Sequence, residues 1–89
     1  MHTPLHIELR FFASVREALG VAGERIELPE GVTTVGAVRE YLVQRGGAWA
    51  EALGPDRALR TAFAHVMCGP EREISDGGEV AFFPPVTGG

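Results

Sequence analysis

Apolar and polar positions alternate over residues 5–12, with the period of a strand that turns one face towards a core. One face carries Leu5, Ile7, Leu9 and Phe11, and the other carries His6, Glu8, Arg10 and Phe12. Residues 25–28 alternate in the same way and stop at a turn, Pro29-Glu30-Gly31. These patterns predict two strands that form a hairpin with a wide loop.

The wide loop and the middle of the chain carry helical patterns. Residues 14–17, Ser-Val-Arg-Glu, fit a capping box, so we expect a short helical turn over residues 14–19. Apolar residues recur three or four apart over residues 34–45, which predicts an amphipathic main helix with Gly46-Gly47 as its stop. A further helical turn is expected over residues 48–53.

The last third of the chain predicts more strands. Residues 60–67 are interpreted as one strand closed by Gly69-Pro70, and residues 79–83 as a final strand after the turn Asp76-Gly77-Gly78. A hairpin, a helix and two or three further strands suit an α+β fold, a mixed sheet packed on one face by one main helix. This is the β-grasp (ubiquitin-like) outline. Its first and last strands are expected to run parallel at the centre of the sheet.

The final strand is followed by Pro84-Pro85, which cannot continue a ladder because neither residue has an amide donor. We therefore divide the chain into a β-grasp domain, residues 1–83, and an extended C-terminal tail, residues 84–89. The tail ends in Gly88-Gly89. Glycine has no side chain, so this pair can thread a narrow channel in a partner enzyme.

Composition excludes several classes of function. The 89 residues carry a formal net charge of −4, and no basic patch is available for nucleic acid. No apolar run is long enough to span a membrane, and the start lacks a signal-peptide pattern, so a cytoplasmic protein is expected. Cys68 is the single cysteine and the histidines are scattered, so we expect no metal site and interpret Cys68 as a small hydrophobic residue.

The parity of the two aromatic pairs predicts an exposed patch. Phe11-Phe12 and Phe82-Phe83 lie on strands expected to be neighbours, so one member of each pair must point away from the helix-covered face. By parity these are Phe12 and Phe83. An exposed apolar patch beside the start of the tail favours a protein interface. Arg16 is either a solvated helix residue or a partner contact.

Two runs of sequence carry a resemblance to a known family. Phe11-Phe12-Ala13 with Val15-Arg16-Glu17, and the stretch from Asp76-Gly77 through residues 79–89, Glu-Val-Ala-Phe-Phe-Pro-Pro-Val-Thr-Gly-Gly, resemble the small subunit of molybdopterin synthase, the MoaD family of ubiquitin-like sulfur carriers. The resemblance departs from the family in its turns, at residues 64–70 and 76–78, and the tail matches.

The resemblance implies a chemistry for the tail. Gly89 is expected to be adenylated by a MoeB-type activating enzyme that consumes ATP, and then converted to a thiocarboxylate with sulfur from a donor such as a cysteine desulfurase. The tail is expected to insert into the large subunit, of the MoaE type, in a heterotetramer, where the sulfur builds the dithiolene of molybdopterin. No cofactor is expected on the chain itself. The expected sites are Gly88 and Gly89 for the chemistry, and, for partner binding, Phe12, Arg16, Met67, Phe83, Pro84, Pro85, Val86 and Thr87.

Two alternatives stay open. A carrier with the same chemistry could serve thiazole synthesis or tRNA thiolation, or could be conjugated to lysines as a protein modifier. A different class is a non-catalytic β-grasp interaction module with an inert end. Removal of Gly88-Gly89 discriminates between these classes, because sulfur transfer requires the tail and binding by a plain module does not.

Overall fold

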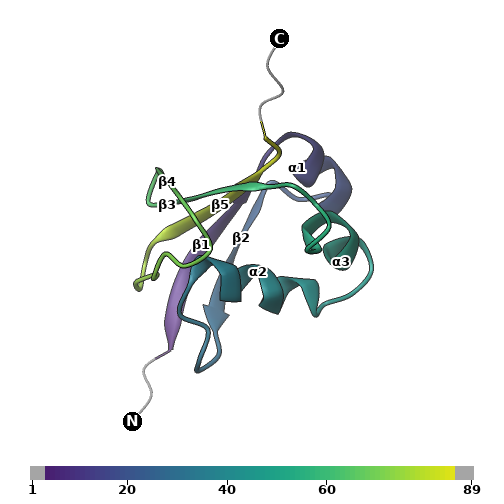
Figure 1. Ribbon diagram of the computed structural model, residues 1–89. Coiled ribbons are helices and arrows are strands. Elements are labelled where there is room, and N and C mark those ends of the chain that lie inside the picture. Colours follow the sequence, from purple (N-terminus) through teal and green to yellow (C-terminus); the bar gives the residue numbers. More distant parts are fainter. Residues whose placement is uncertain (1–3, 86–89) are drawn as a thin grey trace.

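The computed structural model describes residues 4–85 (Figure 1). Over that range, strands and helices follow one another in the order β1 (Leu5–Phe11), α1 (Ala13–Leu19), β2 (Gly23–Leu28), α2 (Val35–Val43), α3 (Ala48–Leu53), β3 (Arg60–Phe63), β4 (Val66–Cys68) and β5 (Glu79–Phe83).

The strands form one mixed sheet in the order β2-β1-β5-β3-β4. The central pair, β1 and β5, runs parallel, with Phe11 opposite Phe82, and the other three pairings are antiparallel. The predicted parallel pairing of the first and last strands is therefore confirmed. It brings the two ends of the described chain to opposite ends of the sheet, as Figure 1 shows.

The core lies between the sheet and the helices on one of its faces (Figure 1). Ile7, Leu9 and Phe11 of β1 are buried, as the alternation predicted, and so are Val35, Val38 and Leu42 of α2, whereas Leu5 and Tyr41 are partly buried. The largest fully buried side chains of the core are Phe11, Phe82, Ile7, Leu9, Leu28, Leu42 and Leu53. The expected α+β class and β-grasp arrangement are confirmed. No helix within residues 4–85 combines the length and apolar character needed to cross a membrane.

The start of α1 differs from the predicted capping box. The N-cap is Phe12, whose side chain makes no capping bond, and Ser14 lies inside the helix. The Phe12 carbonyl accepts from the amides of Val15 and Arg16, at 3.1 and 3.4 Å, so the backbone alone closes the first turn. Ala13 has a φ of +51°, which turns the chain sharply from the strand into the helix. A side-chain motif could not have revealed this backbone turn.

The stretch predicted as one strand over residues 60–67 is a hairpin of two strands, β3 and β4. The chain reverses at Ala64 and His65, whose φ values are +51° and +68°. Positive φ at two successive residues is the signature of a tight hairpin turn, which usually carries Asn-Gly or Asp-Gly. Ala-His has no such signature, so the pattern hid the turn.

Other predicted boundaries are close to the observed ones. Thr34 caps α2, since its hydroxyl accepts the Ala37 amide at 3.1 Å. Gly77 has a φ of +84°, and its amide bonds the His6 carbonyl at 2.7 Å, which fixes the turn before β5. This turn returns the chain to the centre of the sheet, so β5 emerges at the same end as β1.

Candidate functional site

The candidate site is the end of β5, from which the tail departs. Strand β5 ends at Phe83, and Pro84 and Pro85, both half-buried, follow it at the upper end of the sheet in Figure 1. The remaining predicted site residues, Val86, Thr87, Gly88 and Gly89, lie outside the described residues. Because β5 is the central strand, the tail begins in the middle of the sheet.

Two aromatic pairs lie back to back at this end of the sheet. Phe11 and Phe82 stack in the core with ring centroids 6.1 Å apart, and Trp49 of α3 meets Phe11 edge to face at 5.6 Å. On the opposite face, Phe12 and Phe83 meet edge to face at 6.3 Å. Phe12 is 47% exposed and Phe83 is half-buried. The predicted assignment of the inner and outer pairs is confirmed.

The outer pair continues into an apolar face on the helix-free side of the sheet. Strand pairing places Ala81 of β5 beside Ala62 of β3, and Ala62 beside Met67 of β4. Met67 is 52% exposed and lies about 10 Å from Ala81, two strand spacings across the sheet. We call Phe12, Phe83, Ala81, Ala62 and Met67 the outer apolar face. Its two alanines, Ala62 and Ala81, are only 9% and 6% exposed, so the exposed apolar area of this face comes from Phe12, Phe83 and Met67.

Arg16 lies on α1, the helix that begins directly after Phe12. It is exposed, and its amide lies 3.4 Å from the carbonyl of Phe12, the N-cap of α1. The sequence left open whether Arg16 is a solvated helix residue or a partner contact. Arg16 is exposed on α1, and its role as a partner contact stays a prediction.

The other candidates do not gather near the tail. Cys68 packs against the core, with Sγ 3.9 Å from the Thr61 hydroxyl oxygen. His6 contacts Glu27 and Asp76 at the opposite end of the sheet, and His65 lies 3.6 Å from Glu79. Within residues 4–85, no three His, Cys, Asp or Glu side chains are grouped so as to hold a metal ion.

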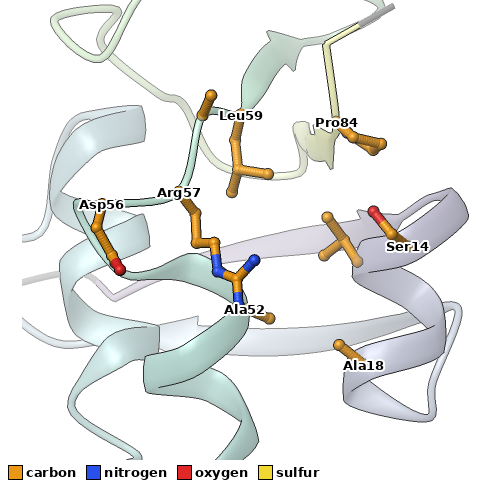
Figure 2. A pocket seen from close by; sticks show the side chains of 9 residues that line it. Ser14, Ala18, Ala52, Asp56, Arg57, Leu59 and Pro84 are labelled. Atoms are coloured by element: carbon orange, nitrogen blue, oxygen red, sulfur yellow. The ribbon is translucent and has the colours of Figure 1, made fainter. Parts of the chain in front are cut away.

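Sequence reasoning missed a pocket beside Pro84. It has a volume of about 350 Å³ and lies between α1 and the connection from α3 to β3 (Figure 2). Ser14 and Ala18 line it from α1, and Arg57 enters it from the connection. No motif marks these residues in the sequence. They meet only because the fold packs α1 against α3 next to the end of β5.

The fold defines a ubiquitin-like β-grasp protein whose last described residues, Pro84 and Pro85, follow a central strand. The chain belongs to the ThiS family, whose model matches residues 9–89. It is 42% identical to the molybdopterin synthase sulfur carrier subunit of Haemophilus influenzae and 40% identical to that of Escherichia coli. Each match covers 93% of this chain and 99% of the relative.

Solved structures support the same fold. A putative molybdopterin converting factor subunit 1 from Pyrococcus furiosus superposes with a TM-score of 0.74 at 27% identity, covering 92% of this chain and 99% of that one. A chain from the protein–protein complex of subunits 1 and 2 of the molybdopterin-converting factor of Helicobacter pylori superposes with a TM-score of 0.66 at 23% identity. That match covers 96% of this chain and all of the other, and it shows the fold alone.

Proposed function

We propose that this chain is the sulfur carrier subunit of a molybdopterin synthase, and that Gly89 carries the sulfur as a thiocarboxylate. The observation that carries the proposal is the near full-length identity of 40–42% to two sulfur carrier subunits. The geometry supports it, because the last described residues leave the central strand beside an apolar face suited to a large partner.

The chemistry requires activation by another enzyme. A C-terminal carboxylate has a pKa of about 3.3 to 3.7, so at neutral pH it is an anion and a poor acyl donor. Attack of the Gly89 carboxylate on ATP forms an acyl adenylate and releases pyrophosphate. Hydrosulfide, or its equivalent from a sulfur donor, then displaces AMP and leaves the thiocarboxylate. When the thiocarboxylate sulfur forms a bond to the pterin precursor, the carrier is held as a thioester. Water then cleaves the bond between the Gly89 carbonyl carbon and the sulfur, so the sulfur stays on the precursor and the carboxylate is regenerated.

The outer apolar face is the proposed docking surface for the large subunit. Phe12, Phe83 and Met67 supply exposed apolar area, and Arg16 supplies a charge at the rim. Large aromatic side chains and arginine are the residues that most often dominate binding at protein interfaces. In this proposal the large subunit covers this face and takes up the residues that follow Pro85.

The remaining partners follow from the chemistry. An adenylating enzyme of the MoeB type uses ATP, and a donor such as a cysteine desulfurase supplies sulfur. The chain binds no cofactor of its own in this scheme, and two carriers with two large subunits form the heterotetramer. The proposed compartment is the cytoplasm, where ATP and the donor are present.

Intact mass measurement tests the proposal. The protein is incubated with ATP, the activating enzyme and a sulfur source, and a mass gain of one sulfur minus one oxygen is expected. A variant without Gly89 is the control and should show no gain. If the wild-type mass stays unchanged with an enzyme that thiocarboxylates a known carrier, the proposal is wrong and the interaction module takes its place.

A carrier for thiazole synthesis or tRNA thiolation would give the same mass gain. Reconstitution separates these functions: the thiocarboxylated protein is mixed with the large subunit of molybdopterin synthase from the same genome and the pterin precursor. Formation of the dithiolene product supports the proposed function. A carrier that is charged but yields no dithiolene with an active large subunit belongs to another thiolation route.

A further inference from the structure

The pocket beside Pro84 contains an arginine that the fold holds in place. The Arg57 amide donates to the Gly54 carbonyl at 2.9 Å, and the Arg57 carbonyl accepts from Arg39 Nη2 at 2.7 Å. Its side-chain Nε donates to the Glu51 carbonyl at 3.0 Å. Backbone and side chain are therefore both anchored. The terminal nitrogens of the guanidinium remain to face the pocket.

The pocket gives this guanidinium an environment suited to an anion. Figure 2 shows the Arg57 guanidinium beside Ala52, with Ala18 and Ser14 of α1 across the pocket from it. The one acidic residue of the lining, Asp56, lies on the other side of Arg57 from α1 in this view. Within residues 4–85, no carboxylate forms an ion pair with Arg57. Ser14 and Ala18, which line the pocket on the α1 side, have small side chains, so a short acidic side chain can enter the pocket.

The pocket lies next to the start of the tail, which indicates what kind of molecule would occupy it. Pro84 lines the pocket, so the pocket lies directly beside the point where the tail begins. The outer apolar face lies on one side of β5, and the pocket lies on the helix side of the same end. A partner that encloses the tail thus meets apolar surface on one side and a fixed positive charge on the other.

We propose that this pocket receives an Asp or Glu side chain of the large subunit, which pairs with the Arg57 guanidinium and forms a second anchor beside the tail. The inference rests on the proposed function, since it takes the large subunit as the protein that encloses the tail. A guanidinium that is already fixed loses little side-chain freedom on binding, so the pair gains more of its interaction energy. Its planar fork also suits two parallel hydrogen bonds to one carboxylate.

The test measures binding of the full-length chain to the large subunit from the same genome by titration calorimetry. Arg57→Gln should raise the dissociation constant about tenfold. Raising the salt concentration should weaken wild-type binding more steeply than binding of the variant. Arg72→Gln is the matched control. Arg72 is also exposed and also bonds a backbone carbonyl, that of Glu73 at 3.2 Å, but it contacts Phe63, at the other end of β3.

A second variant separates binding from folding. Ala18→Glu places a carboxylate on the exposed surface of α1 at the pocket, where it should pair with Arg57 and compete with the partner, while Ala18→Gln should bind as wild type does. The thermal midpoint of each variant shows whether the domain is intact. Unchanged affinity and salt dependence in folded Arg57→Gln, or equal affinities for the two Ala18 variants, would overturn the inference. Absence of binding by the wild type would count against the proposed function instead.

Discussion

Phe12 and Phe83 meet edge to face on the helix-free side of the sheet, with ring centroids 6.3 Å apart and ring planes at 84°. They come from positions 71 residues apart in the chain, and the parallel pairing of β1 with β5 brings them together. Their neighbours in sequence, Phe11 and Phe82, stack in the core. One strand pair thus builds both the centre of the core and the exposed aromatic contact beside the tail.

Substitutions in the two aromatic pairs should therefore have separate effects. We expect Phe83→Ala to weaken binding of the large subunit by about 2 kcal/mol, in the range of an interface hot spot, and to change the free energy of unfolding by less than about 1 kcal/mol. Phe82→Leu should leave the binding surface in place and lower the free energy of unfolding by about 1 to 2 kcal/mol, because it removes packing from a fully buried site.

Urea denaturation and calorimetric titration of both variants measure the two quantities. The double variant provides a control for additivity. A Phe83→Ala protein that binds as tightly as wild type would remove the outer apolar face from the proposed interface. A Phe83→Ala protein that loses several kcal/mol of stability would show that the outer pair serves the fold.

The alternation of polar and apolar positions was sufficient to predict most of the fold. Residues 5–11, with their strict period of two, gave the first strand and its buried face, and the same parity separated Phe82 from Phe83. The alternation predicts the strand because a sheet with one buried face requires apolar side chains at every second position. The inner and outer aromatic pairs were predictable for the same reason.

What escaped prediction depends on the backbone or on distant packing. The hairpin turn at Ala64 and His65 uses positive φ without the residues that favour it, and the helix at Ala13 begins without a side-chain cap. Arg57 lies in a connection with no periodicity, and its anchoring bonds come from residues 3 to 18 positions away. No local pattern records such contacts.

The hairpin turn leads to a prediction about stability. Residues other than Gly, Asn and Asp are strained at positive φ by roughly 1 kcal/mol each. The double variant with Ala64→Asn and His65→Gly supplies the residues that this turn prefers, so we expect its free energy of unfolding to rise by about 1 kcal/mol. Urea denaturation at equilibrium measures the change.

A glycine elsewhere provides the control for the turn variant. Ala58→Gly lies at an exposed position without positive φ and should lower stability, since glycine adds freedom to the unfolded chain. If the turn variant is also less stable than wild type, the contacts of His65, including its approach to Glu79, outweigh the strain.

Arg39 ties α2 to the connection that carries Arg57. Its guanidinium donates to the carbonyls of Leu53, Gly54 and Arg57 at 2.6, 2.6 and 2.7 Å. Lysine cannot reproduce this fork, so Arg39→Lys should lower the free energy of unfolding by about 1 to 3 kcal/mol although the charge is kept.

Chemical denaturation of Arg39→Lys checks this prediction, with Arg72→Lys as the control that makes the same change at an exposed arginine. Hydrogen exchange adds a local readout, and the amides of residues 54–57 should exchange faster in Arg39→Lys. Equal stability of the two lysine variants would show that the three carbonyls find water or lysine as adequate partners.

The last prediction concerns the ion pair between β2 and the end of α2. Arg45 donates from Nη1 and Nη2 to the two carboxylate oxygens of Glu24, at 3.0 and 2.7 Å, and its guanidinium lies 4.4 Å from the centre of the Trp49 ring. These hydrogen bonds lower the pKa of Glu24 below its usual 4.5, although partial burial opposes the shift. A lowered folded-state pKa means that the charged form stabilises the fold.

The lowered pKa of Glu24 makes the free energy of unfolding depend on pH. The contribution of Glu24 is fully present above about pH 4.5, the unfolded value, and is lost as the pH falls through the lower folded value. Glu24→Gln should therefore be less stable than wild type at pH 7, by at most about 1 kcal/mol because both side chains are partly exposed to solvent. The difference should shrink as the pH falls below 4.5.

Thermal unfolding of both proteins between pH 7 and pH 3 measures this difference. Glu30→Gln removes the same charge from an exposed turn residue and reports the effect of net charge alone. High salt should reduce the Glu24 effect at pH 7, since exposed ion pairs are screened. A stability difference that stays constant from pH 7 to pH 3 would show that Glu24→Gln acts through altered packing against Arg45, and that the ion pair contributes nothing to the fold.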